Sequence, residues 1–153
     1  QHPDYILKQL QDLKLGMTSG GKEGRMDPVM SAMAMPLSEQ DMKDLAAYFS
    51  SINMTEGATP KDVVEVGEML FKAGDAERGI PSCAACHGPR GNGSSLAKFP
   101  KISFQHPGYI KSQLEKFRDG TRHNDLNGMM GDIAKKLTDK DIEVLSQYLG
   151  GLH

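Results

Sequence analysis

The stretch Cys83-Ala84-Ala85-Cys86-His87 decides how this 153-residue chain is built. It follows the pattern C-x-x-C-H, the attachment signature of a c-type haem. Residues three apart on one helical turn point the same way, so both thiols can reach one edge of a macrocycle. The histidine next to them then lies beneath the iron and supplies a proximal nitrogen. We therefore expect one covalent haem held by Cys83 and Cys86, with His87 as an axial iron ligand.

Other uses of the cysteine pair fit the sequence less well. A structural zinc site needs further ligands, commonly a second cysteine pair, and the chain contains only 2 Cys. A thioredoxin-like redox pair would follow a strand in a βαβ setting, and no convincing strand pattern is present. Two cysteines this close cannot staple a long loop, which excludes a disulfide scaffold.

Composition excludes further classes of protein. The chain has 18 Lys plus Arg against 20 Asp plus Glu, without the basic excess of a nucleic-acid-binding surface. No stretch approaches the roughly 20 apolar residues of a membrane span, although peripheral membrane association stays open. There is no Trp and aromatic residues make up only 6%. The core must therefore come from aliphatic side chains, Met and Ala, or from the haem itself.

An internal repeat organises the chain. Residues 1–15 (QHPDYILKQLQDLKL) resemble residues 105–119 (QHPGYIKSQLEKFRD) at an offset of 104. Residues 37–42 resemble residues 137–142 at an offset of 100, and Tyr48 matches Tyr148 in the same register. Two copies of one small unit are the simplest explanation. We expect residues 53–59 to form the linker between the copies.

Helical periodicity dominates both copies. Apolar spacing predicts helices over residues 5–15 and 109–118, and a further helix that opens at Thr59-Pro60. Ser38 and Thr138 each stand three residues before an aspartate and predict capping boxes at the start of two more helices. Residues 18–27 are expected to form a loop. The fold class predicted is all-α, with small helical bundles wrapped around haem.

The sixth iron ligand should be a methionine, because a soft thioether suits low-spin haem iron. Met129 and Met130 are both candidates, and both could instead be ordinary core fillers. The repeat favours Met130, because it aligns with Met30 whereas Met129 aligns with Val29.

Other residues near the haem motif have a functional and a plain structural interpretation. The Pro100 carbonyl could bind the free ring nitrogen of His87, or Pro100 could only form a turn. Tyr109 is expected to pack on the haem or in the core. His2 and His106 are expected at helix starts rather than at a haem edge. A set of basic residues is expected on a solvated face, with some of them steering a partner; they are Lys8, Lys14, Lys111, Lys116, Arg118 and Arg122.

These features together resemble the cytochrome c4 family of di-haem class I cytochromes c. The resemblance rests on the Cys83–His87 motif, Phe99-Pro100-Lys101-Ile102, residues 105–109, the Met130 region that leads into residues 136–142, and the closing residues 148–153. It implies two similar domains, each with one His/Met-ligated haem. It supports His87 and Met130 as axial ligands, and the Pro100 carbonyl as the partner of the other His87 ring nitrogen.

The resemblance also implies an incomplete first domain. Residues 1–55 match only the distal half of a cytochrome domain and contain no haem motif, whereas residues 56–153 match a complete one. We expect about 40–45 further residues ahead of the first copy, judged from the leader of the second. If they carry an upstream motif, Met30 is the iron ligand of a first haem. Copper binding by the methionines around Met30 is a weaker alternative.

The function predicted is one-electron transfer rather than enzymatic catalysis, because an iron with both axial positions filled has no open site for a substrate. Haem loading after export implies the bacterial periplasm. Methionine ligation is expected to raise the reduction potential enough for the protein to donate electrons to a terminal oxidase of a respiratory chain. The alternative is the cytochrome subunit of a larger redox enzyme, such as a flavocytochrome sulfide dehydrogenase. A haem peroxidase or sensor is a third class, and it would need Met130 to be absent or displaceable.

Overall fold

The computed structural model of the chain describes residues 1–152, so His153, which ends the expected second domain, lies outside the described residues. Helices make up both halves of the molecule. Between residues 1 and 152, extended pairing is limited to two isolated bridges, Asp75 with Ile80 and Ser94 with Phe99. The expected all-α fold is confirmed.

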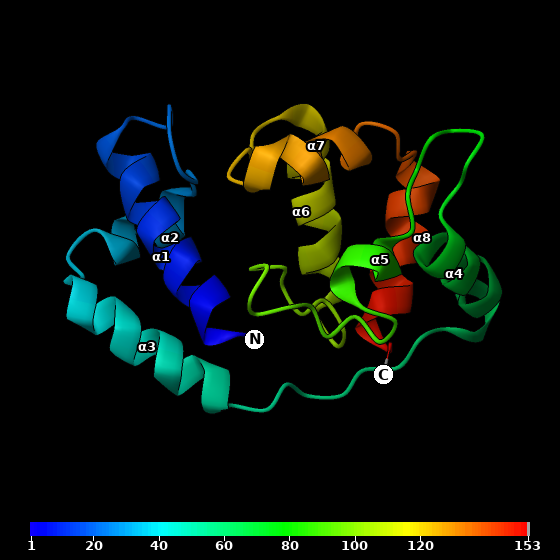
Figure 1. The fold of residues 1–153 in the computed structure, drawn as a ribbon, viewed down its shortest axis with the longest axis horizontal. Coiled ribbons are helices and arrows are strands. Elements are labelled where there is room, and N and C mark those ends of the chain that lie inside the picture. Colours follow the sequence, from blue (N-terminus) through cyan, green and yellow to red (C-terminus); the bar gives the residue numbers. More distant parts are fainter. Residues whose placement is uncertain (153) are drawn as a thin grey trace.

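The first half of the chain contains α1 (Pro3–Thr18), α2 (Pro28–Ala34) and α3 (Glu39–Ser51). It forms the blue and cyan group in Figure 1, in which α1 packs on both α2 and α3. The short helix α2 was not expected. It forms because Asp27 accepts hydrogen bonds from the backbone N–H groups of Val29 and Met30, and Pro28 occupies the first helical position.

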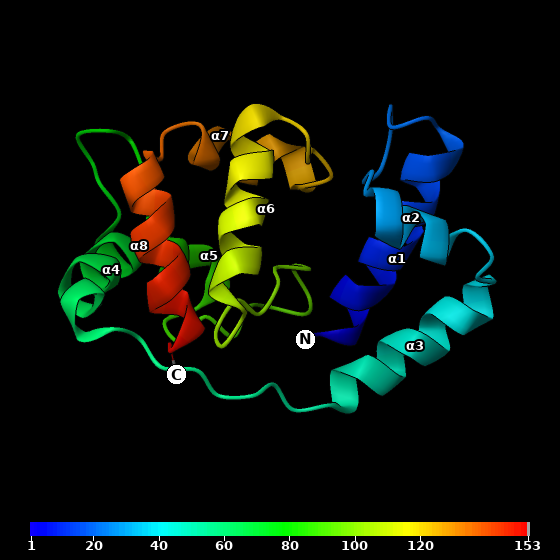
Figure 2. The same ribbon diagram turned by 180° about the vertical axis from the view of Figure 1, so that it is seen from behind.

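The second half is larger, and its helices surround the haem motif. In Figures 1 and 2, α8 lies between α4 and α6 and packs on both. The elements are α4 (Lys61–Ala73), α5 (Cys83–His87), α6 (Pro107–Asp119), the 3-10 turn η1 (Leu126–Gly128), α7 (Met129–Ala134) and α8 (Asp139–Gly150).

The repeat is visible in the helices, since α6, α7 and α8 follow the same order as α1, α2 and α3. Both expected capping boxes are confirmed, at Ser38 with Asp41 and at Thr138 with Asp141. His2 and His106 occupy the N-cap positions of α1 and α6, so they stand at helix starts as expected. Equivalent sequence signals therefore produced equivalent helix boundaries in the two halves.

The apolar core of the second half joins α4, α6 and α8. Its buried members are Leu70, Phe71, Ile80, Ile110, Leu114, Leu137, Ile142, Leu145, Tyr148, Leu149 and Leu152. The closest approach is at Gly67, where an added Cβ would lie 2.6 Å from Cβ of Tyr148. Because only glycine leaves room for the tyrosine there, α4 and α8 can pack closely.

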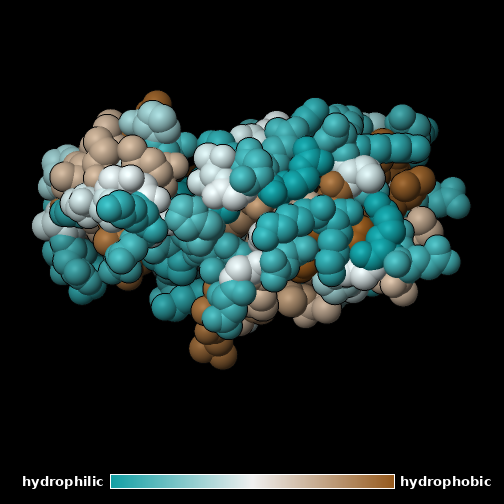
Figure 3. Space-filling model, turned by 90° about the horizontal axis from the view of Figure 1, so that it is seen from above, coloured by the Kyte–Doolittle hydropathy of each residue, from teal (hydrophilic) through white to brown (hydrophobic). Residues whose placement is uncertain are grey.

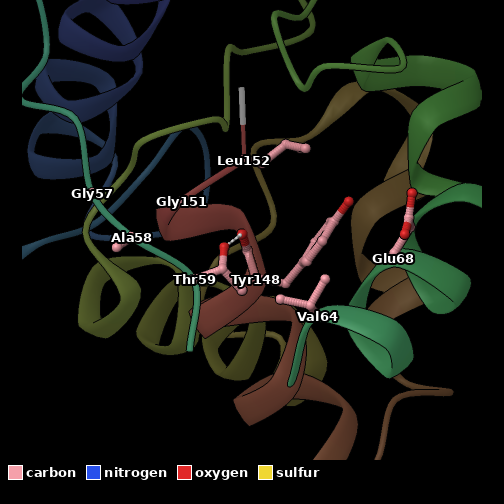
Figure 4. Close-up of a pocket in the computed structure, with 8 residues that line it drawn as sticks. All are labelled: Gly57, Ala58, Thr59, Val64, Glu68, Tyr148, Gly151 and Leu152. Atoms are coloured by element: carbon pink, nitrogen blue, oxygen red, sulfur yellow. Dashed lines mark hydrogen bonds between the residues drawn. The ribbon is translucent and has the colours of Figure 1, made fainter. Parts of the chain in front are cut away.

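Residues 53–60 connect the halves without helical structure and run along one side of the molecule, as the linker in Figures 1 and 2. The end of the linker is fixed to α8, because the Thr59 hydroxyl donates to the Tyr148 carbonyl at 2.9 Å. A groove lies where the linker meets α4 and α8 (Figure 4), and none of the residues expected to bind haem lines it.

Candidate haem site

The haem motif forms a helix of its own, α5, in which Cys83 and Cys86 lie three residues apart on the same turn. Cys83 is half-buried against the apolar core, and burial raises the pKa of its thiol to about 11. Cys86 is exposed. The motif therefore presents one sulfur at the core and one at its outer edge, both from one helical turn.

His87 is held in one orientation at the end of α5. The side chain is buried, with 7% of its surface exposed, and its Nδ1 lies 2.9 Å from the carbonyl oxygen of Pro100. A carbonyl only accepts, so Nδ1 carries the proton and Nε2 presents its lone pair. Burial lowers the pKa of His87, which favours the neutral ring that can bind a metal.

The loop after α5 brings the Pro100 carbonyl to His87. The backbone N–H of Gly93 donates to the His87 carbonyl at 2.7 Å, and Ser94 then pairs with Phe99 in a tight turn. Gly93 has a φ of +71°, and an added Cβ would lie 2.4 Å from the Phe99 carbonyl oxygen. Only glycine meets both conditions, so this position determines where the loop returns.

Met130 lies in the first turn of α7, half-buried against the apolar core. It contacts the same core cluster as Cys83, Ala84 and Ile102, so the structure brings these residues around one apolar region. The start of α7 is set by Gly128, with a φ of +71°, and by the Gly131 N–H, which donates to the Asp125 carboxylate at 3.0 Å.

Two other residues named from the sequence lie elsewhere. Met30 is on α2 in the first half, with 47% of its surface exposed. Tyr109 is 42% exposed at the start of α6, and its hydroxyl accepts a hydrogen bond from Arg25 at 3.3 Å. Neither belongs to the core cluster that Cys83 and Met130 contact.

The residues around α5 fit a covalently attached haem. They supply two thiols on one turn, an imidazole whose outward nitrogen is free to bind iron, a thioether, and an apolar surround. Among residues 1–152 there is no cluster of three or more His, Cys, Asp or Glu that could hold another metal ion.

One set of functional residues was missed from the sequence. Arg122 was expected on a solvated face, and this is wrong, because only 6% of its surface is exposed and its guanidinium lies 4.5 Å from the centre of the Phe117 ring. Its side chain turns inward to glutamines of both halves, Gln9 and Gln113. The recurrence of these glutamines at an offset of 104 is the signal that could have found the cluster.

Comparison with known proteins agrees with the site. The family profile described as "Cytochrome c" matches residues 64–153, which contain all of α5 and all but the first three residues of α4, the helix that packs on it. The chain is 47% identical to cytochrome c4 of Thiocapsa roseopersicina over 153 residues, covering 99% of this chain and 76% of that protein. It belongs to the cytochrome c4 family, and its function is electron transfer through covalently attached haem c.

The structural likeness extends over both halves. The crystal structure of reduced recombinant cytochrome c4 from Pseudomonas stutzeri matches with a TM-score of 0.95 and 44% identity, covering 99% of this chain and 82% of that one. A thiosulfate dehydrogenase electron acceptor from Stutzerimonas stutzeri is 35% identical over 156 residues, covering 97% of this chain and 66% of that protein. None of the helices within residues 1–152 combines the length and apolar character needed to cross a membrane.

Proposed function

We propose that the chain carries single electrons on a haem attached through Cys83 and Cys86, with His87 and Met130 as the two axial ligands. The observation that carries this proposal is the His87–Pro100 hydrogen bond, which leaves Nε2 as the only ring nitrogen able to bind iron. Haem c, when bound, supplies one-electron redox chemistry. The chain's residues hold it, orient the imidazole and exclude water from its apolar side.

A redox titration followed by visible spectra tests this ligand set. A fully ligated His/Met haem gives a low-spin reduced spectrum and a raised reduction potential. A five-coordinate, high-spin reduced spectrum would contradict the proposal, because it would show an iron position open to substrate.

The cellular role follows from the same chemistry. We place the protein in the periplasm, where c-type haem is loaded after export, and propose a terminal oxidase as its electron acceptor. Reduced protein mixed with membranes from its own cells should be oxidised rapidly, and cyanide should abolish that oxidation. Oxidation that cyanide leaves unchanged would point to a different acceptor.

The domain organisation is also a proposal. Residues 1–55 would be the distal half of a first cytochrome domain and residues 56–153 a complete second one. The matching helix order of the two halves supports this, as does the exposure of Met30 on α2, where it could reach the iron of a first haem. Intact mass is the test: one haem above the 16.7 kDa chain means a single site, and a larger mass with two haems means an upstream motif.

A second candidate is a redox-enzyme partner or subunit, and the thiosulfate dehydrogenase electron acceptor among the relatives favours it. In that case the electrons would come from a sulfur-oxidising dehydrogenase in a stable complex. Native mass measurement of protein from its own cells distinguishes the two candidates. A free protein supports the mobile carrier, whereas a complex with a dehydrogenase supports the subunit.

A further inference from the structure

Six polar side chains between the two halves form a cluster with approximate two-fold symmetry. Each half contributes one tyrosine, one glutamine and one arginine: Tyr5, Gln9 and Arg25 from the first half, and Tyr109, Gln113 and Arg122 from the second. The tyrosines and the glutamines are each 104 residues apart, in the register of the repeat.

The two arginines are also equivalent, although their spacing differs. The backbone N–H of Arg25 donates to the Asp12 carbonyl at 2.8 Å, and that of Arg122 donates to the Lys116 carbonyl at 2.9 Å. Asp12 and Lys116 are again 104 residues apart. Each arginine therefore follows its helix, α1 or α6, at the same place in the fold.

Each guanidinium binds across the boundary in the same way. Arg25 donates to the glutamine of its own half at 2.9 Å, and to Gln113 and Tyr109 of the other half at 2.9 and 3.3 Å. Arg122 likewise donates to Gln113 at 2.9 Å, and to Gln9 and Tyr5 of the other half at 3.1 and 2.9 Å. Both glutamine oxygens are thus shared by two guanidinium groups.

The centre of this cluster is buried, and the cluster contains two positive charges. Gln9, Gln113 and Arg122 are 9%, 8% and 6% exposed. Within residues 1–152, every side-chain oxygen that accepts a hydrogen bond from either guanidinium belongs to a neutral group. Two carboxylates flank the cluster and bind other groups. They are Asp12, bound by Lys8 and Asn124, and Asp27, bound by Lys116 and the N-terminus of α2.

Helix packing does not set the mutual orientation of the halves, which meet through polar contacts. Outside the cluster these contacts include Gln1 with Lys101, His2 with Asn92, and Lys8 with Asn124. Among the described residues no helix of one half packs directly on a helix of the other, and the main apolar core cluster lies wholly in the second half. Figures 1 and 2 both show α1 and α6 facing each other across the boundary. Apolar packing is non-directional, whereas hydrogen bonds restrict angles as well as distances.

We propose that the Tyr–Gln–Arg cluster is the positioning joint of the molecule. It holds the half that carries Met30 in a fixed orientation relative to the half that carries Cys83 and His87, so that electrons can pass between them. The electron-exchange part rests on the proposed function, because it requires a haem in each half. The joint itself requires only the contacts described above.

Two substitutions of one glutamine test the joint: one removes the hydrogen-bond acceptor, and the other replaces it with a negatively charged acceptor. In holoprotein with Gln113→Met, both guanidinium groups lose a shared acceptor, so we expect the helical signal of the first half to melt about 5–10 °C before the haem Soret band changes. Gln113→Glu places a carboxylate between two cations and should keep the two melting curves together. Gln9→Met and Gln9→Glu, at the equivalent position, should behave in the same two ways.

Ser95→Ala is the matched control, because Ser95 also bonds across the boundary, to Asp4, but lies outside the cluster. It should leave both melting curves together. Separate melting in the control, or an unchanged profile in both methionine variants, would overturn the joint. Equal effects of Gln113→Met and Gln113→Glu would also overturn it. If Gln113 acted only by filling space, the buried glutamate would not be tolerated better than the methionine.

Electron exchange gives a second, independent readout. This readout needs protein that intact mass shows to carry two haems. Pulse radiolysis should find electron exchange between the haems slowed at least severalfold by Gln113→Met. Arg122→Lys should slow it similarly, because lysine keeps the positive charge but lacks the planar guanidinium that donates to several acceptors at once. An unchanged rate would overturn the positioning role while leaving the joint in place. A one-haem mass would instead overturn the two-haem proposal, and the melting curves would still test the joint.

Discussion

The two halves of the molecule have the same order of three helices, but one face of the last of these helices is buried in one half and exposed in the other. Tyr148 on α8 is 6% exposed, whereas Tyr48, its equivalent on α3, is 62% exposed. The difference is α4, which packs on α8 and has no counterpart on α3 among the described residues. Figure 3 shows apolar surface on the left lobe, which contains the first half. Within residues 1–152, the helix face that α4 covers on α8 is therefore exposed on α3.

The comparison is tested most strongly at the two equivalent methionines. If Met130 binds the iron beside His87, then Met130→Ala should convert the low-spin spectrum of the haem on His87 to high spin, lower its reduction potential and raise peroxidase activity, because a coordination position opens. Met30→Ala should leave the spectrum of that haem unchanged. The measurement is the visible spectrum of both reduced variants, and a low-spin Met130→Ala protein would exclude this ligand.

The equivalent tyrosines should differ next most. Tyr148→Ala removes a buried ring that packs against Gly67 and Phe71, and should cost about 3–4 kcal/mol of unfolding free energy. Tyr48→Ala removes an exposed ring and should cost less than about 1 kcal/mol. Urea unfolding followed at the Soret band measures the first, and unfolding followed by helical circular dichroism measures both. Similar losses at the two positions would mean that α3 is covered as fully as α8.

The two capping boxes should give smaller and similar effects. Ser38→Ala and Thr138→Ala each remove the side chain that accepts the N3 backbone N–H, which should cost about 1 kcal/mol. Asp141, the aspartate of the second box, is also paired with Arg78, so Arg78→Gln should weaken the second box and leave the first unchanged. Urea unfolding of the single and double variants measures this coupling, and additive losses would show that the ion pair is independent of the cap.

The smallest expected effect is on the stability of the first half at acidic pH. The backbone N–H of Met30 binds Asp27 and, with Lys116 nearby, holds the pKa of that carboxyl below its ordinary value. Its stabilising effect is therefore complete above about pH 4 and is lost as the pH falls through the lowered folded-state pKa. Asp27→Asn should reduce the loss of helix in the first half between about pH 4 and pH 2, and an unchanged acid titration by circular dichroism would contradict this assignment.

Local signals in the sequence predicted much of the fold, because they act over a few residues. The capping boxes and the proline before α4 set helix boundaries within one turn. The C-x-x-C-H motif predicted the chemistry because thiol, imidazole and their spacing are specified by neighbouring residues. The short helices α2 and α7 were missed, since each depends on a single turn of capping rather than on a repeated apolar pattern.

Residues that act across long separations could not be read in this way. Arg122 has the sequence surroundings of a solvated residue, yet it is buried because glutamines of both halves bind it. Likewise, Tyr48 and Tyr148 are equivalent in sequence and opposite in burial, since only the packing of α4 separates them. Periodicity reports which side of a helix is apolar, but it does not report which partner covers that side.

By itself the sequence determined the all-α class, the repeat and the c-type haem motif, because these depend on neighbouring side chains and on helical spacing. The tertiary structure alone decided that the Pro100 carbonyl orients His87, that α4 closes the core of the second half only, and that two arginines meet between the halves. Each of these contacts joins atoms that the chain brings together only on folding, where burial and hydrogen-bond geometry select the partner.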